Sequence, residues 1–257
     1  MNEPPAARAP IFVCGMGRSG TTWISRALGQ SPELTYIQEA WLVRKLDELA
    51  AWFETLHDEW TGFTPWRHSG IDRSVFVDSL ARCYRELLDR AAQGNRFVEK
   101  TPEWNALHLD FLQEMFPDAY YVLVYRDGRN SVASQEVKNH NERKSFDFAT
   151  ACRRWAGAMD AFSASRKRRP ERRLTLIRYE DLIEDFDASF RELCAFAEIE
   201  PFHAVPHRPN SSFAEADGPA DFNSRWQAWP PRKRRIFKQN AGRQLVEWGY
   251  VPSNDAW

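Results

Sequence analysis

The sequence predicts an α/β fold, a three-layer sandwich with a central parallel sheet, and three observations lead to it. Four short β-rich runs stand at 10–14, 96–99, 119–125 and 174–178. Helical patterns separate these runs, and such alternation is typical of crossover units that build a parallel sheet. With 257 residues and 43% hydrophobic content, the chain can bury one substantial core. We therefore expect a single domain over 1–257.

The helices are predicted from apolar residues that recur along one face. Over 146–162 the steps are four and three, and the residues are Phe148, Cys152, Trp155, Met159 and Phe162. A shorter helix is expected around 107–115, and another follows the first strand at 23–28. The segment 200–231 is rich in Pro, Asn, Ser and Gly and is predicted to be a long ordered loop.

The stretch 40–94 is too long for a simple crossover. It holds two helical patterns on either side of a Gly/Pro/Trp-containing link at 61–66. One interpretation is a helical insertion near the open end of the sheet, where an acceptor could be held. The other is a helix pair with only a structural role, and the sequence leaves both open.

Charge and cysteine content exclude several function classes. The 35 basic and 36 acidic residues leave a formal charge of −1, so no overall field attracts nucleic acid. No apolar run approaches the roughly 20 residues of a membrane span, and we expect a soluble, cytoplasmic protein. The four cysteines are scattered without a CxxC pair, which favours reduced, mostly buried thiols over disulfides or zinc ligands.

A glycine-rich turn directly follows the first predicted strand, in the order Gly15-Met16-Gly17-Arg18-Ser19-Gly20-Thr21-Thr22. A strand that enters such a turn and then a helix directs backbone N–H groups at one point, where they can bind a phosphate. The spacing of Gly15 and Gly20 matches the Walker A loop, but Thr21 stands where that loop has lysine. The cation is Arg18, inside the turn. This difference argues against an ordinary ATPase and favours another anionic donor.

A second candidate anion site follows the third predicted strand. Arg126 lies at the carboxyl end of that strand, and Ser134 and Lys138 are four residues apart on the following helix. A guanidinium, a hydroxyl and an ammonium at the carboxyl edge of a parallel sheet suit a phosphate. Two separate anion sites indicate a ligand that is phosphorylated at both ends.

These segments resemble the 5′-phosphosulfate loop and the 3′-phosphate motif of sulfotransferases that use 3′-phosphoadenosine 5′-phosphosulfate (PAPS). Three stretches, 18–22, 124–129 and 178–182, are most similar to the tyrosylprotein sulfotransferases and their bacterial relatives. The similarity runs with gaps from about residue 10 to 248. It implies a P-loop-like sulfotransferase fold.

The resemblance also implies roles for single residues. Arg18, with Ser19, Gly20, Thr21 and Thr22, would bind the 5′-phosphosulfate. Glu39 falls at the position of the catalytic base, and Lys100 matches a lysine that stabilises the departing nucleotide. Further nucleotide contacts are implied for Arg126, Ser134 and Lys138 at the 3′-phosphate, and for Tyr179, Ser211 and Arg225. Whether Ser211 or its neighbour Ser212 makes the contact stays open.

The expected reaction moves a sulfonate from PAPS to an acceptor hydroxyl, with Glu39 as base. We favour a small phenol, alcohol, sugar or natural product over a protein tyrosine as acceptor, and a monomer or homodimer as the assembly. A sulfonate carries less charge than a phosphoryl group, so fixed cations can replace a metal, and none is expected. One alternative is a kinase in which Glu99 has a Walker-B-like role, and another is a nucleotide-binding protein without activity.

Overall fold

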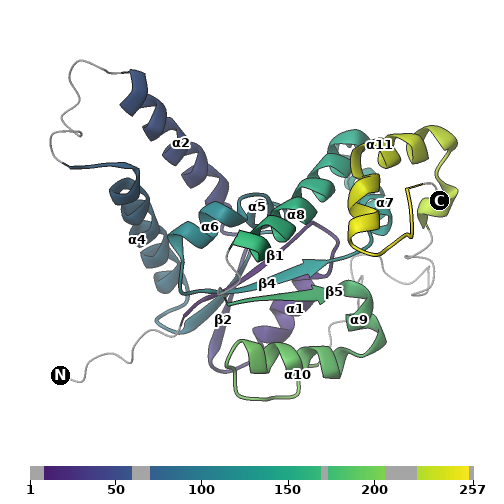
Figure 1. Ribbon diagram of the computed structural model, residues 1–257. Helices are drawn as coiled ribbons and strands as arrows, with labels where there is room; N and C mark the ends of the chain where they lie inside the picture. The colour runs from purple at the N-terminus through teal and green to yellow at the C-terminus, as the bar shows by residue number, and fades with distance from the viewer. Residues whose placement is uncertain (1–8, 60–69, 169–172, 206–224, 255–257) are drawn as a thin grey trace.

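The computed structural model describes residues 9–59, 70–168, 173–205 and 225–254. Five parallel strands form one sheet in the order β2-β3-β1-β4-β5. Their bounds are β1 Ile11–Gly15, β2 Leu34–Gln38, β3 Arg96–Lys100, β4 Tyr120–Tyr125 and β5 Leu174–Arg178. Helices cover both faces, which confirms the three-layer α/β prediction (Figure 1).

One helical layer consists of α1 (Thr21–Leu28), α9 (Tyr179–Glu184) and α10 (Phe186–Phe196). These helices pack against Ile11, Val13 and Val122 from the sheet. The opposite layer contains α5 (Trp104–Leu107), α6 (Leu109–Met115), α7 (Gly128–Asn141), α8 (Phe148–Arg168) and α11 (Pro231–Glu247). Its larger core includes Phe12, Tyr121 and Trp155, so alternate residues of each strand face the two layers.

The insertion between β2 and β3 is helical, as expected. Helix α2 (Val43–Glu59) begins near the carboxyl end of β2, and α4 (Arg73–Ala91) returns the chain to the amino end of β3. The two helices contact each other and stand out from the sheet as an arm (Figure 1). Phe53 and Phe76 stack between them with ring centroids 4.2 Å apart. The predicted link at 61–66 lies outside the described residues.

The sequence patterns missed one strand, β2. It is the edge strand beyond β3, and only Leu34 of its five residues is buried. An edge strand that is covered incompletely lacks the continuous apolar run by which the other four were found. The predicted loop at 200–231 is only partly described, and within it 225–228 form a short 3₁₀ helix (Arg225–Ala228).

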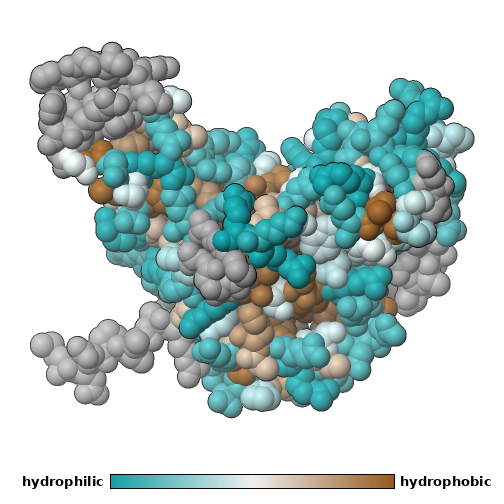
Figure 2. Space-filling view, in the orientation of Figure 1, coloured by the Kyte–Doolittle hydropathy of each residue, from teal (hydrophilic) through white to brown (hydrophobic). Residues whose placement is uncertain are grey.

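The surface in this orientation is mostly hydrophilic (Figure 2). Hydrophobic side chains gather at the level of the sheet, between the two helical layers. None of the helices in the described part of the chain has both the length and the apolar character that a membrane span requires.

Candidate active site at the carboxyl edge of the sheet

The glycine-rich turn leads from β1 into α1, as the sequence predicted. Gly20 is the residue before the helix and has a φ of 93°, in the left-handed region that glycine enters without strain. A Cβ at this position would lie 2.6 Å from the ring of Tyr179. Thr21 and Thr22 open the helix, where backbone N–H groups have no partner within the helix and can bind an anion.

The two predicted anion sites touch each other. The Nε of Arg18 donates to Oγ of Ser134 over 3.1 Å. In return, the guanidinium of Arg126 donates to the backbone carbonyl of Arg18 over 2.9 Å. We call these two bonds the arginine crossover. The structure thus brings together the turn after β1 and the segment after β4.

The environment of Arg18 is strongly cationic. Burial lowers the pKa of Arg18, and the neighbouring Arg126 lowers it further. Tyr179 and Glu142 oppose this lowering. Two guanidiniums held this close repel each other, and an anion between them would reduce that repulsion. The 3₁₀ helix that begins with Arg225 contacts α7, the helix that carries Ser134.

Tyr179 closes the site from the end of β5. It is 4% exposed, and the guanidinium carbon of Arg126 lies 4.3 Å from its ring centroid. The ring also meets Trp23 of α1 edge-on. Tyr179 therefore holds Arg126 in place beside the turn.

Lys138, one helical turn after Ser134 on α7, has a far more exposed side chain than Ser134. Its side chain is 47% exposed, and its ammonium lies 3.7 Å from Glu142. Ser134, by contrast, is 3% exposed and contacts Arg18. Ser211 lies outside the described residues.

Two residues of α7 that were not predicted as site residues, Ser131 and Gln135, support the turn. Ser131 Oγ and Gln135 Nε2 both donate to the carbonyl of Gly17, over 3.2 and 3.0 Å. Ser131 and Gln135 are four residues apart and therefore share a helix face, and that periodicity was the signal that could have found them.

Glu39 and Lys100 meet at the ends of β2 and β3. The ammonium of Lys100 lies 2.9 Å from Oε1 of Glu39, and the Lys100 side chain is 1% exposed against 29% for Glu39. The backbone N–H of Glu39 donates to the carbonyl of Lys100 over 2.8 Å. Burial lowers the pKa of Lys100, while Glu39 opposes that shift. A carboxylate and an ammonium side by side can accept a proton and stabilise a leaving anion.

Glu99, the alternative Walker-B-like residue, is fully buried. Its oxygens accept hydrogen bonds from Thr101, Asn105 and the backbone N–H of Ala40. Burial raises the pKa of this carboxyl. Its contacts are with the protein interior, and they do not favour the kinase alternative.

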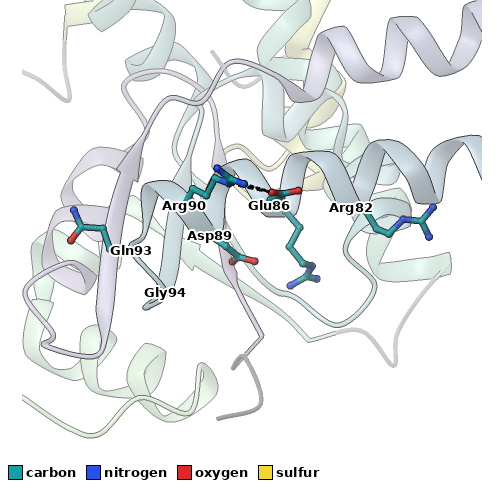
Figure 3. Close-up of a pocket in the computed structure, with 7 residues that line it drawn as sticks. Arg82, Glu86, Asp89, Arg90, Gln93 and Gly94 are labelled. Carbon is teal, nitrogen blue, oxygen red and sulfur yellow. Dashed lines mark hydrogen bonds and ion pairs between the residues drawn. The ribbon is translucent and has the colours of Figure 1, made fainter. Parts of the chain in front are cut away.

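A separate hollow of about 490 Å³ lies on α4 and is lined by Arg82, Arg85, Glu86, Asp89, Arg90, Gln93 and Gly94 (Figure 3). Gln93 and Gly94 directly precede β3, so the hollow lies at the amino edge of the sheet. Ligands of open parallel sheets bind at the opposite edge. The Arg90 guanidinium also pairs with Glu86 at 2.6 Å. This hollow is not the candidate site.

Comparison with known proteins agrees with this geometry. The sequence profile of the sulfotransferase family matches residues 10–204. The chain belongs to the sulfotransferase family. A Caenorhabditis elegans relative, protein-tyrosine sulfotransferase A, is 26% identical over 196 residues, which cover 74% of this chain and 50% of that protein. The chain spans half or less of the length of the tyrosine sulfotransferases that it matches.

Solved structures of sulfotransferases share the fold. The sulfotransferase domain of the Synechococcus PCC 7002 olefin synthase superposes with a TM-score of 0.56 at 19% identity, covering 92% of this chain and 97% of the domain. Mouse sulfotransferase SULT7A1, crystallised with PAP, gives a TM-score of 0.51 at 14% identity and covers 94% of this chain and 85% of its own. The resemblance seen in the motifs is therefore confirmed, both for the family and for the fold.

Proposed function

We propose that this protein transfers a sulfonate from PAPS to an acceptor hydroxyl. The observation that carries the proposal is the position of the Glu39 and Lys100 pair, at the same sheet edge as the cationic turn. The family membership and the PAP-bound mouse relative support the choice of donor.

The turn and the arginine crossover suit a donor with an anion at each end. The N–H groups at the start of α1 and Arg18 would hold the 5′-phosphosulfate, and Arg126 and Ser134 would hold the 3′-phosphate. Tyr179 would border the nucleotide. Lys138, Ser211 and Arg225 stay predictions for nucleotide contacts.

Each residue of the reacting pair has one task. Glu39 accepts the proton of the acceptor hydroxyl as that oxygen bonds to sulfur and the bond from sulfur to the phosphate oxygen breaks. Lys100 and Arg18 stabilise the negative charge that the nucleotide gains as it leaves. The transfer needs no metal in this scheme, because fixed cations neutralise the donor.

The acceptor would enter beside the arm. Trp41 lies two residues beyond Glu39, and it is 53% exposed with a φ of 59°. An exposed indole next to the base offers a flat apolar surface to a phenol or a sugar ring. We therefore propose a small phenol, alcohol, sugar or natural product as acceptor, although the named relatives are tyrosine sulfotransferases. A cytoplasmic location and a monomeric or homodimeric state also stay predictions.

Titration with PAP in EDTA tests the donor claim first. We expect saturable binding without metal, whereas a kinase would bind ATP only with Mg²⁺. Absence of PAP binding would refute the proposal.

A screen of acceptor classes with saturating PAPS, read by the mass of the sulfated product, then tests transfer. Glu39→Gln should lower turnover by about 100-fold or more, as loss of a general base does. The matched control is Glu86→Gln, the same chemical change on the exposed face of α4, which should retain full turnover. Binding of PAP without sulfation of any acceptor would favour a nucleotide-binding protein without activity, whereas equal turnover of Glu39→Gln and the wild type would refute Glu39 as the base.

A further inference from the structure

A fully buried carboxylate, Glu99, stands directly beside the reacting pair and has no task in the scheme above. We propose that Glu99 is a positioning residue: it fixes the turn 39–41 and thereby the direction in which Glu39 presents its carboxylate. This inference rests on the proposed function, since it gives Glu99 its role through the base.

The contacts of Glu99 join three segments. Its Oε1 accepts the hydroxyl of Thr101 at 2.5 Å and the N–H of Ala40 at 3.3 Å. Its Oε2 accepts the side-chain amide of Asn105 at 2.7 Å. The carboxylate thus connects the end of β3, the start of α5 and the turn that follows β2.

Three successive amides of the turn are held by three successive residues of the neighbouring strand end. The N–H of Glu39 donates to the carbonyl of Lys100, that of Ala40 to Glu99, and that of Trp41 to the hydroxyl of Thr101 at 3.4 Å. Only the first of these bonds is of the kind that a sheet supplies. The other two depend on the side chains of Glu99 and Thr101.

The turn has a backbone that needs such support. Glu39 and Trp41 both have a φ of 59°, in the left-handed region that residues other than glycine rarely adopt. Such conformations persist where the surroundings hold them, and they concentrate at functional sites. Without Glu99, the turn could relax and Glu39 would leave the ammonium of Lys100.

A purely structural role would predict a different pattern of effects. A fully buried residue cannot touch the acceptor, so Glu99 can influence the reaction only through its neighbours. If it acts through Glu39, its removal should matter only while Glu39 carries its carboxylate. This coupling is measurable in a double-mutant cycle.

The experiment compares Glu99→Gln, Glu39→Gln and the double variant. Glu99→Gln keeps the volume but replaces an acceptor oxygen by an NH₂ group. We expect at least a tenfold lower kcat with PAP affinity within twofold, and no further loss when Glu99→Gln is added to Glu39→Gln. If Glu99→Gln lowered kcat by the same factor in the wild type and in Glu39→Gln, the proposal would be overturned.

Two further variants separate positioning from loss of stability. Ser165→Ala removes another fully buried hydrogen bond, from Ser165 to Gln113 at 2.9 Å between α8 and α6, and should leave kcat within twofold. Thr101→Ser, which keeps the hydroxyl, should retain activity, whereas Thr101→Val should resemble Glu99→Gln.

Amide hydrogen exchange tests the same inference without activity. Glu99→Gln should speed exchange in the peptide that contains 39–41 by at least tenfold, while Ser165→Ala should not. If no acceptor is sulfated, the proposed function fails but this exchange result still decides the role of Glu99. Unchanged exchange at 39–41 in Glu99→Gln would refute the positioning role of Glu99.

Discussion

The loop half of the molecule and the helical arm differ in how their polar groups are held. We define the loop half as residues 15–22 and 126–135 with Tyr179, and the arm as α2 and α4. In the loop half Ser19, Arg126 and Ser134 are each 3% exposed or less. In the arm, pairs such as Arg44 with Glu48 are exposed and join residues one helical turn apart. Trp52 of the arm is 54% exposed.

This contrast indicates which changes each half tolerates. Buried hydrogen bonds that join segments distant in sequence are costly to break, because each leaves a partner unsatisfied. Exposed ion pairs within one helix contribute about 0.3–0.5 kcal/mol and can be exchanged readily. We therefore expect the loop half to accept few substitutions, whereas the arm can vary with the acceptor.

The largest effect is expected at Arg18. Arg18→Ala removes a cation from the place where charge develops and breaks the bond to Ser134, and turnover should fall about 100-fold or more. Arg18→Lys keeps the charge but lacks the Nε donor, so its turnover should lie between those of the wild type and Arg18→Ala. Steady-state rates at saturating PAPS measure this. If turnover of Arg18→Ala fell by less than threefold, the loop half would tolerate substitution as well as the arm does, contrary to the contrast drawn above.

Gly20→Ala should have the next largest effect, on folding. The new Cβ meets both a φ of 93° and the Tyr179 ring at 2.6 Å, so the free energy of unfolding should fall by about 2–3 kcal/mol. Gly94→Ala is the matched control, because its φ is 82° and no atom lies within 4 Å of the added Cβ. It should cost about 1 kcal/mol. Urea unfolding of both proteins measures the difference, and equal losses would contradict the close fit of Tyr179.

The pH dependence of stability should change in Glu180→Gln. Burial raises the pKa of Glu180, which accepts the N–H of Asp127 at 3.1 Å. Between the ordinary pKa near 4.5 and the raised one, the folded state binds more protons than the unfolded state. Stability of the wild type should therefore fall with rising pH in this window relative to Glu180→Gln. Parallel urea-derived stability curves of the two proteins from pH 4.5 upward would contradict this.

The smallest effect on the donor is expected at Trp41. Trp41→Ala should leave PAP affinity within twofold and change the free energy of unfolding by less than about 0.5 kcal/mol, because the indole is exposed. Its KM for the acceptor should rise. Trp52→Ala, a similarly exposed change within α2, should alter neither the affinity for PAP nor the KM for the acceptor. Weaker PAP binding in Trp41→Ala would show that the acceptor side, where Trp41 precedes the arm, and the loop half do not act independently.

The loop half was predictable from sequence because its signals are local. The turn at 15–22 and Arg126 each follow an apolar strand directly, and parallel strands bring such ends to one edge. The different environments of Ser134 and Lys138, by contrast, do not follow from helix spacing. Helix spacing places their Cβ atoms on one face, but the long lysine side chain turns to Glu142.

The reacting pair was not predictable from local pattern. Glu39 follows β2, which the patterns missed, so only family resemblance placed it. Its contact with Lys100 depends on the register in which Gln38 pairs with Lys100 across the sheet. The bonds of Glu99 to Ala40, Thr101 and Asn105 likewise depend on three segments meeting, which no single stretch of sequence encodes.

The arginine crossover has a consequence for selection among cellular nucleotides. The two proposed phosphate sites are joined by the hydrogen bonds from Arg18 to Ser134 and from Arg126 to the Arg18 carbonyl. A ligand with both a 5′ and a 3′ anion would engage both arginines at once. ATP has no 3′-phosphate and would lack the contact that we propose between that group and Arg126. The protein would thus bind ATP more weakly than PAPS because ATP lacks a 3′-phosphate, and no group that repels ATP is needed.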